Sequence, residues 1–91
     1  MSYVLRYTDE ADETIAKYKK SNPMAYKKVL RLLKEITEHP REGTGHPEPL
    51  VGGDNITYSR RISGRDRLVY DIYDDVITVL IISAGGHYND K

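Results

Sequence analysis

The sequence contains no cysteine, which excludes disulfide bonds, a thiolate nucleophile and a zinc site built from thiolates. It also has no net charge, with 14 basic and 14 acidic residues, whereas general nucleic-acid-binding domains carry a clear excess of lysine and arginine. No apolar run approaches the ~20 residues that cross a bilayer, and residues 1–7 lack the basic and apolar regions of a secretory signal. These absences predict a cytoplasmic protein with no membrane-spanning segment.

The charges that are present are unevenly distributed. Seven basic residues and no acidic one lie between Lys17 and Lys34, and four acidic residues crowd residues 9–13 just before them. A run of this kind is usually the solvated face of a helix, and acidic residues at the start of a helix suit its dipole. The pattern therefore favours a helix that begins near residue 9.

The first half of the chain predicts a short strand followed by two helices. Residues 2–7 are expected to form the strand, and Thr8 is a suitable N-cap for a helix over residues 9–20. Asn22-Pro23 favours the start of a second helix, which should end before Pro40. Joined by so few residues, the two helices are expected to pack as an antiparallel hairpin. The apolar stripe of the second helix is expected at Tyr26, Leu30, Leu33, Ile36 and Thr37.

The second half predicts a long loop and three strands. Residues 41–55 are rich in glycine and proline, which argues against a regular element there. Strands are predicted over residues 57–62, 66–72 and 76–83, and the last is so apolar that we expect it to be central and covered on both faces. The chain should form one domain, residues 1–91. The order β-α-α-β-β-β predicts an α+β fold, with the helical hairpin on one face of a mainly antiparallel sheet and the other face open.

Four arginines lie in the predicted hairpin of residues 58–70, which turns at Ser63-Gly64. Since side chains alternate along a strand, Arg60 should lie on one face of the sheet and Arg61 on the other. Fixed positive charges on a β-surface suit a polyanion. The ordinary alternative is that the arginines pair across strands with one of three carboxylates: Asp66, Asp71 or Glu48.

Two further residues could take part in chemistry with the arginines. Glu48 lies between two prolines, which fix φ and stiffen its segment, and His87 follows the last predicted strand. Each alone is more simply an exposed side chain. Together with arginine they suit RNA cleavage, because carboxylate and imidazole can act as base and acid while arginine stabilises charge on phosphate. The histidines lack metal-binding spacing and no P-loop is present, so neither a metal nor a cofactor is predicted.

Four short motifs resemble one family of proteins. They are Gly43-Thr-Gly-His-Pro-Glu-Pro-Leu50, Tyr58-Ser-Arg-Arg-Ile62, Arg67-Leu-Val-Tyr70 and His87-Tyr88. In this order and at these spacings they are similar to the YoeB/Txe toxins, which belong to the RelE-like superfamily. The first half of the chain matches that family only as a strand and a basic helical hairpin.

The resemblance implies both a fold and a function. It implies a RelE-like α+β fold and a metal-independent mRNA endoribonuclease, which acts on the ribosome and inhibits translation as the toxin of a bacterial type II toxin–antitoxin module. The implied partners are a cognate antitoxin that blocks the site, the ribosome and its mRNA. Family members can also form a homodimer, although the sequence shows no separate apolar stripe for one.

The resemblance also assigns roles to individual residues. Glu48 would be the general base, Arg67 would stabilise the phosphorane, and His87 would be the general acid. Arg61 would hold phosphate, and Tyr88 would position a base or stack on it. No metal ligand is implied.

Three departures from the family pattern bear on activity. Val51 replaces a lysine that many members carry, Tyr58 replaces a common tryptophan, and Gly85-Gly86 replace an arginine and an aromatic residue. The glycines predict a looser tail, with an entropic cost of about 1 kcal/mol for fixing His87. Two alternatives stay open: a toxin-like module that binds its antitoxin or RNA without cleavage, and a hairpin that binds duplex nucleic acid, against which the zero net charge argues.

Overall fold

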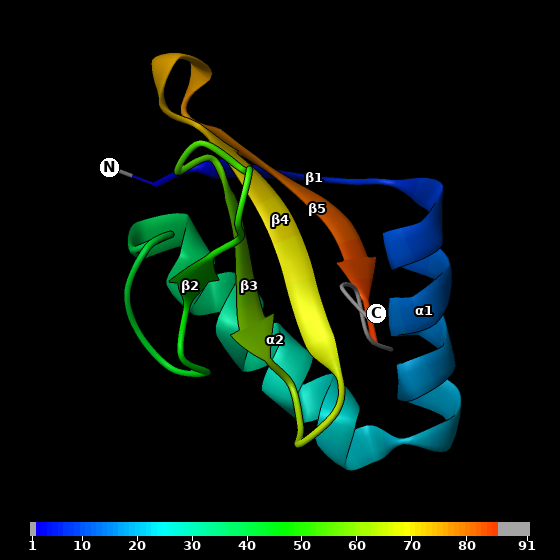
Figure 1. Cartoon of the computed structure of the whole chain (residues 1–91). Helices are drawn as coiled ribbons and strands as arrows, with labels where there is room; N and C mark the ends of the chain where they lie inside the picture. Colours follow the sequence, from blue (N-terminus) through cyan, green and yellow to red (C-terminus); the bar gives the residue numbers. More distant parts are fainter. Residues whose placement is uncertain (1, 86–91) are drawn as a thin grey trace.

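The computed structural model describes residues 2–85 and arranges them as a five-stranded sheet with two helices on one face (Figure 1). The strands lie in the order β1 (Val4–Tyr7), β5 (Thr78–Ala84), β4 (Arg67–Tyr73), β3 (Thr57–Arg61) and β2 (Glu48–Pro49). β1 runs parallel to β5, and the other neighbours are antiparallel. The helices are α1 (Asp9–Ser21) and α2 (Pro23–Glu38), and a 3₁₀ turn, η1 (Asp74–Val76), connects β4 to β5. The predicted α+β fold is confirmed.

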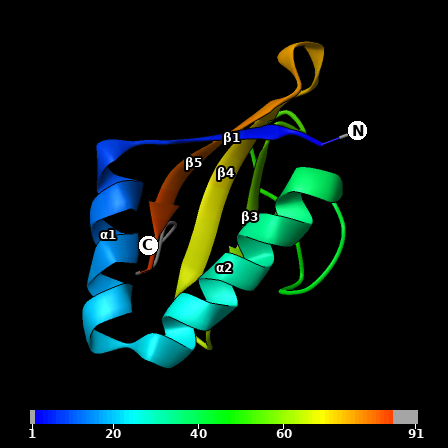
Figure 2. The same cartoon turned by 180° about the vertical axis from the view of Figure 1, so that it is seen from behind.

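Local caps begin both helices where the sequence predicts them. The Thr8 hydroxyl accepts a hydrogen bond from the Ala11 backbone N–H at 3.1 Å, and the Asn22 side chain accepts one from the Ala25 N–H at 3.2 Å. Pro23 then occupies the first turn of α2, where its missing N–H leaves no hydrogen bond unmade. The helices diverge from this connection, so that α1 lies beside β5 while α2 covers the back of β3 and β4 (Figure 2).

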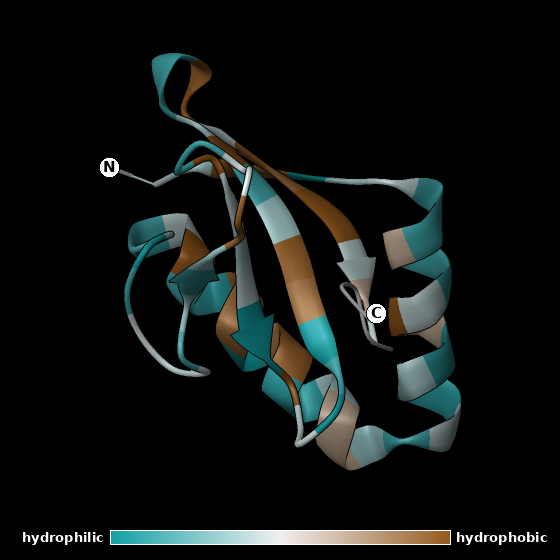
Figure 3. Ribbon diagram, in the orientation of Figure 1, coloured by the Kyte–Doolittle hydropathy of each residue, from teal (hydrophilic) through white to brown (hydrophobic). Residues whose placement is uncertain are grey.

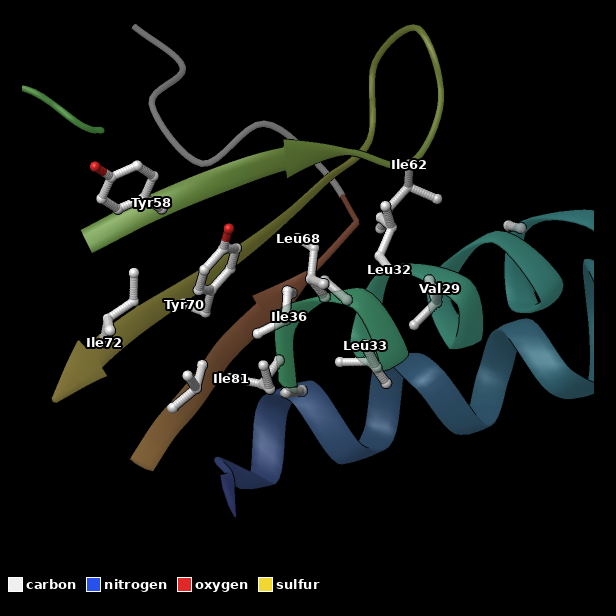
Figure 4. Packing of buried hydrophobic residues seen from close by; sticks show 14 residues of the cluster. Val29, Leu32, Leu33, Ile36, Tyr58, Ile62, Leu68, Tyr70, Ile72 and Ile81 are labelled. Atoms are coloured by element: carbon white, nitrogen blue, oxygen red, sulfur yellow. The ribbon is translucent and has the colours of Figure 1, made fainter. Parts of the chain in front are cut away.

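The core lies between α2 and the sheet (Figure 4). Part of the stripe predicted for α2 is wrong, because Leu30 is 46% exposed whereas Leu32 is fully buried. Both sets of positions have helical spacing, and only the position of the sheet decides which set is buried. The buried residues of α2 are Ala25, Val29, Leu32, Leu33 and Ile36.

Alternate residues of β3, β4 and β5 complete the core, and Figure 3 shows the apolar middle of β4 and β5. The rings of Tyr58 and Tyr70 stack with their centroids 6.3 Å apart. β5 lies inside the sheet, but the prediction that both its faces are covered is wrong. Val79 and Ile81 are fully buried, whereas Leu80 between them is only half-buried. The helices cover one face alone, and the burial of β5 alternates accordingly.

The glycine-rich segment of residues 41–55 contains a strand where the sequence predicts no regular element. Glu48 and Pro49 form β2, opposite Ser59 and Tyr58 of β3 respectively. Pro49 has no N–H to donate, which suits a strand at the edge of a sheet. Glu48 is therefore held on the sheet edge and does not project from a loop.

Candidate active site

Arg61 and Arg67 lie directly opposite each other on β3 and β4. Residues in this relation project to the same face, with Cβ atoms about 4.5–5.5 Å apart. It is the face away from the helices, since the neighbouring Arg60 is buried on the helix side. Within residues 2–85, neither the Arg61 nor the Arg67 side chain has a hydrogen bond or an ion pair. Like charges directly opposite destabilise a sheet, so the stability of the fold does not account for this pair.

Glu48 shares the face of these two arginines. It lies opposite Ser59, which precedes Arg61 by two residues on β3, so all three side chains project to one side. Glu48 and Arg61 are both exposed. From a strand spacing of about 4.8 Å and a rise of about 3.3 Å per residue, the Cα atoms of Glu48 and Arg67 lie about 12 Å apart. A carboxylate and two guanidinium groups therefore line one face across three adjacent strands, β2, β3 and β4.

The face opposite the helices is not uniformly open. One row of residues crosses it from β2 to β5, with Glu48 opposite Ser59, Ser59 opposite Val69, and Val69 opposite Ser83. The last three are buried, with exposures of 1%, 0% and 7%. Glu48 therefore lies at the β2 edge of this face, and Arg61 and Arg67 lie at the end of the sheet where β3 stops and β4 begins.

The chain leaves β5 beside Arg67. The Gly85 N–H donates to the Arg67 carbonyl at 2.9 Å, and Gly85 has a φ of +80°, which favours glycine. A Cβ at Gly85 would stand only 2.6 Å from the Tyr18 hydroxyl oxygen. The backbone conformation and the close approach of Tyr18 both explain why a glycine occupies position 85. The sequence suggests only the entropic cost of fixing His87. His87 and Tyr88, the predicted acid and base-stacking residue, lie outside the described residues.

Tyr18 of α1 holds this corner of the sheet. Burial, together with the charge and the hydrogen bond of Asp66, raises the pKa of Tyr18 to about 12. The phenol therefore stays protonated at neutral pH and donates to the Asp66 carboxylate, which directly precedes Arg67. One helix side chain contacts both the start of β4 and the end of β5.

Arg60 lies on the helix side, as strand alternation predicts, and is completely buried. The cross-strand pairing considered for the arginines does not apply to it, because its carboxylate partner is Glu35 of α2, with Nη1 and Oε1 3.2 Å apart. Hydrogen bonds from the backbone and side chain of Thr44, aided by the Arg60 charge, lower the pKa of Glu35. The sequence signals the burial of Arg60, because it occupies an apolar-face position between Tyr58 and Ile62, but it does not indicate Glu35 as the partner.

Arg41 ties the two ends of the segment that carries Glu48. Its guanidinium donates to the Asp74 carboxylate from Nη1 at 3.2 Å and from Nη2 at 3.1 Å, and Nη2 also donates to the Asn55 carbonyl at 3.1 Å. Hydrogen bonds from Arg41 and from the Tyr3 hydroxyl lower the pKa of Asp74. The segment therefore starts and ends at one fixed point beside η1.

Two other features are absent from residues 2–85. No group of three or more histidine or acidic side chains in this range could hold a metal ion. Neither helix in it is long and apolar enough to cross a membrane.

The α+β fold described above agrees with the family that the motifs suggest. A sequence profile of the YoeB-like toxins of bacterial type II toxin–antitoxin systems matches residues 7–88. The chain belongs to this family. The resemblance predicted from the four motifs is thereby confirmed, and with it the assignment to the toxins of toxin–antitoxin systems.

Individual YoeB toxins are similar over nearly their whole length. The chain is 34% identical to the toxin YoeB of Streptomyces coelicolor over 84 residues, which cover 92% of this chain and 98% of that one. It superimposes on the YoeB dimer of Staphylococcus aureus with a TM-score of 0.84 at 31% identity, covering 97% of this chain and 100% of that one. The TM-score to YoeB in the YoeB–YefM complex of the same organism is 0.79 at 32% identity, with the same coverage. These likenesses agree with a RelE-like α+β fold.

Proposed function

We propose that this YoeB-like toxin is a ribosome-dependent mRNA endoribonuclease, which acts in the cytoplasm and needs no metal ion. One observation carries the proposal. Arg61 and Arg67 oppose each other without a carboxylate partner among the described residues, and Glu48 lies on the same face. A phosphate diester bound there would relieve the repulsion, because guanidinium groups bind phosphate oxygens in a bidentate manner.

The chemistry that suits this arrangement is attack of a ribose 2′-OH on the adjacent phosphate. Glu48 takes the proton from the 2′-OH as its oxygen bonds to phosphorus, and the bond from phosphorus to the 5′-oxygen breaks. Arg61 holds the phosphate, and Arg67 stabilises the charge that develops on it, which is usually a large part of catalysis. By resemblance to the family, His87 protonates the leaving 5′-oxygen and Tyr88 stacks on a base. The products are a 2′,3′-cyclic phosphate and a 5′-hydroxyl.

The helical surface supports action on the ribosome. The seven basic residues between Lys17 and Lys34 follow one another across α1 and α2 with no acidic residue among them, and all but Lys28 are exposed. A basic surface of this kind attracts the phosphate backbone of RNA irrespective of sequence. It is provided by the helices, whereas the candidate active site is on the opposite face of the sheet. One molecule can therefore contact ribosomal RNA and mRNA with different surfaces.

The cognate antitoxin is the proposed protein partner, since a Staphylococcus aureus relative forms a complex with YefM. A groove of about 740 Å³ between α2 and the turn after β3 has apolar residues in its floor, among them Ala25 and Ile62, and Lys27, Lys28 and Arg31 along its wall. Its composition suits an acidic segment with apolar side chains. A homodimer is proposed on the same grounds, because another relative forms one.

Expression of the toxin alone in a bacterium tests the proposal. We expect growth arrest, with new mRNA 5′ ends that carry a hydroxyl group and appear only in translated reading frames. Glu48→Ala, Arg67→Ala and His87→Ala should each relieve the arrest, since general acid–base catalysis contributes about 10²- to 10⁴-fold and loss of one group that stabilises the developing charge costs about 10²- to 10³-fold. Arg65→Ala, at an exposed position in the turn, is the control and should stay toxic.

Two results would contradict the proposal. Full toxicity of all three variants would show that these side chains do not carry the reaction. Arrest without new 5′ ends would indicate a module that binds its antitoxin or RNA without cleavage.

A further inference from the structure

We propose that Arg60 is a positioning residue for catalysis, which holds Glu48 at its working distance from Arg61 and Arg67. Arg60 faces the core and cannot touch a substrate bound on the opposite face. It acts through the backbone of residues 39–45, the segment that leads to Glu48. This inference rests on the proposed function only in the role that it gives to Glu48.

The Arg60 side chain satisfies its whole hydrogen-bonding capacity at one place. A guanidinium group has five N–H donors in a fixed planar array, and Arg60 has an acceptor for each. Nε donates to the Tyr70 hydroxyl at 2.9 Å, Nη1 to Glu35 at 3.2 Å and to the Thr44 carbonyl at 3.3 Å, and Nη2 to two further carbonyls, those of His39 at 2.6 Å and Glu42 at 2.7 Å.

Three of these acceptors are carbonyls of consecutive turns between α2 and β2. The Tyr70 hydroxyl, which accepts from Arg60, donates in turn to the carbonyl of Pro40 at 2.8 Å. Four carbonyls from residues 39–44 are therefore fixed by one guanidinium group and one phenol. Because the acceptors are backbone atoms, this arrangement fixes the path of the chain.

The fixed path ends next to the site. The Arg61 N–H donates to the Gly45 carbonyl at 2.7 Å, so the segment that Arg60 holds is bonded to the backbone of the neighbouring arginine. A Cβ at Gly45 would stand 3.0 Å from the Arg61 carbonyl and 3.2 Å from the Leu32 side chain, so the segment lies as close to β3 as a chain can. Only His46 and Pro47 separate Gly45 from Glu48.

The ion pair with Glu35 alone gives little reason for an arginine at this position. Apolar residues of similar volume often replace a buried ion pair with no loss, or with a gain, of stability. An apolar side chain would leave the three carbonyls without their donors, however, and a lysine has only three donors and no planar fork. Only an arginine can donate hydrogen bonds to all of these backbone carbonyls at once. Misplacement of a catalytic group by about 1 Å can cost about 10²-fold in rate.

A double-mutant cycle separates positioning from general destabilisation. The measurement is the single-turnover rate of mRNA cleavage at saturating ribosome concentration, for Arg60→Lys in the wild-type background and in a Glu48→Gln background. We expect a loss of at least about 10-fold in the first and less than about 2-fold in the second, because a misplaced base is harmless once the base is gone. The affinity for ribosomes should not change. Equal losses in both backgrounds would overturn the inference.

Arg65→Lys is the matched control, since it makes the same change on an exposed residue of the same hairpin. Tyr70→Phe is the second variant should Arg60→Lys fail to fold. It keeps the aromatic ring and removes one acceptor from Arg60 and the hydrogen bond to Pro40. It should show the same dependence on Glu48 with a smaller loss, and a loss independent of Glu48 would contradict the proposal.

Amide hydrogen exchange tests the inference without cleavage. Arg60→Lys should accelerate exchange at Thr44 and Arg61, whose N–H groups donate to Glu35 and to Gly45, and should leave the β4–β5 ladder protected. Unchanged protection of the two amides would refute the positioning role even if the wild type cleaves RNA. A wild type that does not cleave refutes the proposed function, and the exchange result still decides whether Arg60 fixes the segment.

Discussion

Replacement of Gly85 by alanine should destabilise the fold by about 2 kcal/mol, although Gly85 is the last described residue. Its φ of +80° costs an L-residue about 1–2 kcal/mol, of which about 0.4–1 kcal/mol is offset by the lower entropy of the unfolded chain. The new Cβ would also stand 2.6 Å from the Tyr18 hydroxyl oxygen. Moving this hydroxyl away breaks its hydrogen bond to Asp66, which costs about 1 kcal/mol more.

Two other glycines separate the backbone strain from the steric contact. Gly52 has a φ of +84° and no atom within 4 Å of a built Cβ, so Gly52→Ala should show the backbone strain alone. Gly64 has open space and no positive φ, and Gly64→Ala should be neutral or should stabilise by about 0.4–1 kcal/mol. In a Tyr18→Phe background the hydroxyl is absent and the tightest contact left to the built Cβ is the Thr14 methyl group at 3.3 Å, so the cost of Gly85→Ala should fall close to that of Gly52→Ala.

Urea unfolding monitored by circular dichroism gives the free energies, with equal m-values as the condition for comparing them. The order of destabilisation expected is Gly85→Ala, then Gly52→Ala, then Gly64→Ala. The steric explanation fails if Gly85→Ala costs no more than Gly52→Ala in the wild type. It also fails if the Tyr18→Phe background leaves the cost of Gly85→Ala unchanged.

Three further changes have expected outcomes. The folded-state pKa of Glu35 is lowered. Its contribution to the free energy of unfolding is therefore present above the unfolded pKa of about 4.3 and is lost as the pH falls through the lower folded value. Urea titrations from pH 2 to 7 should show a smaller loss of this free energy at acid pH for Glu35→Gln than for the wild type. The pKa of Tyr18 is raised to about 12, so its contribution is present below about pH 10 and is lost as the pH rises towards 12, and Tyr18→Phe should remove that part of the alkaline loss. The double variant Lys27→Ala/Lys28→Ala should weaken ribosome binding and leave the cleavage rate at saturating ribosome concentration unchanged. The slope of log affinity against log salt concentration should fall by about 1 for each phosphate group that the variant no longer binds. An unaltered slope would exclude these lysines from the RNA-binding surface.

The parts of the fold that the sequence predicts well depend on neighbouring residues. Thr8 caps α1 and Asn22-Pro23 begins α2, because a cap needs only the N–H group three residues further along the chain. Alternation along β3 separates Arg60 from Arg61 for the same reason. None of these features requires a tertiary contact.

The parts that the sequence misses depend on distant residues. The stripe of α2 includes Leu32 and excludes Leu30 because of where the sheet lies, and helical spacing allows either. β2 forms because Glu48-Pro49 meets an unpaired edge of β3, and no local propensity in a segment rich in glycine and proline indicates that edge. The carboxylate partner of Arg60 lies 25 residues away on another element. The sequence thus predicts on which face of the sheet the arginines of the candidate site lie. It does not predict the long-range contacts of Arg60 that fix the segment leading to Glu48.

Arg60 and Arg61 look alike in the sequence, yet the structure gives them different surroundings, a set of backbone carbonyls for Arg60 and an opposing arginine for Arg61. Arg60 has an acceptor for each of its donors, whereas Arg61 faces Arg67 with no partner among the described residues. Arg61→Thr removes the repulsion between like charges and introduces a β-branched residue on a strand, so it should raise the free energy of unfolding by about 0.2–1 kcal/mol while reducing toxicity. Inorganic phosphate should stabilise the wild type more than the variant, since an anion that binds the folded state raises its stability. Destabilisation by Arg61→Thr, or equal stabilisation of both proteins by phosphate, would mean that this arginine serves the sheet and that the opposed pair is not an anion site.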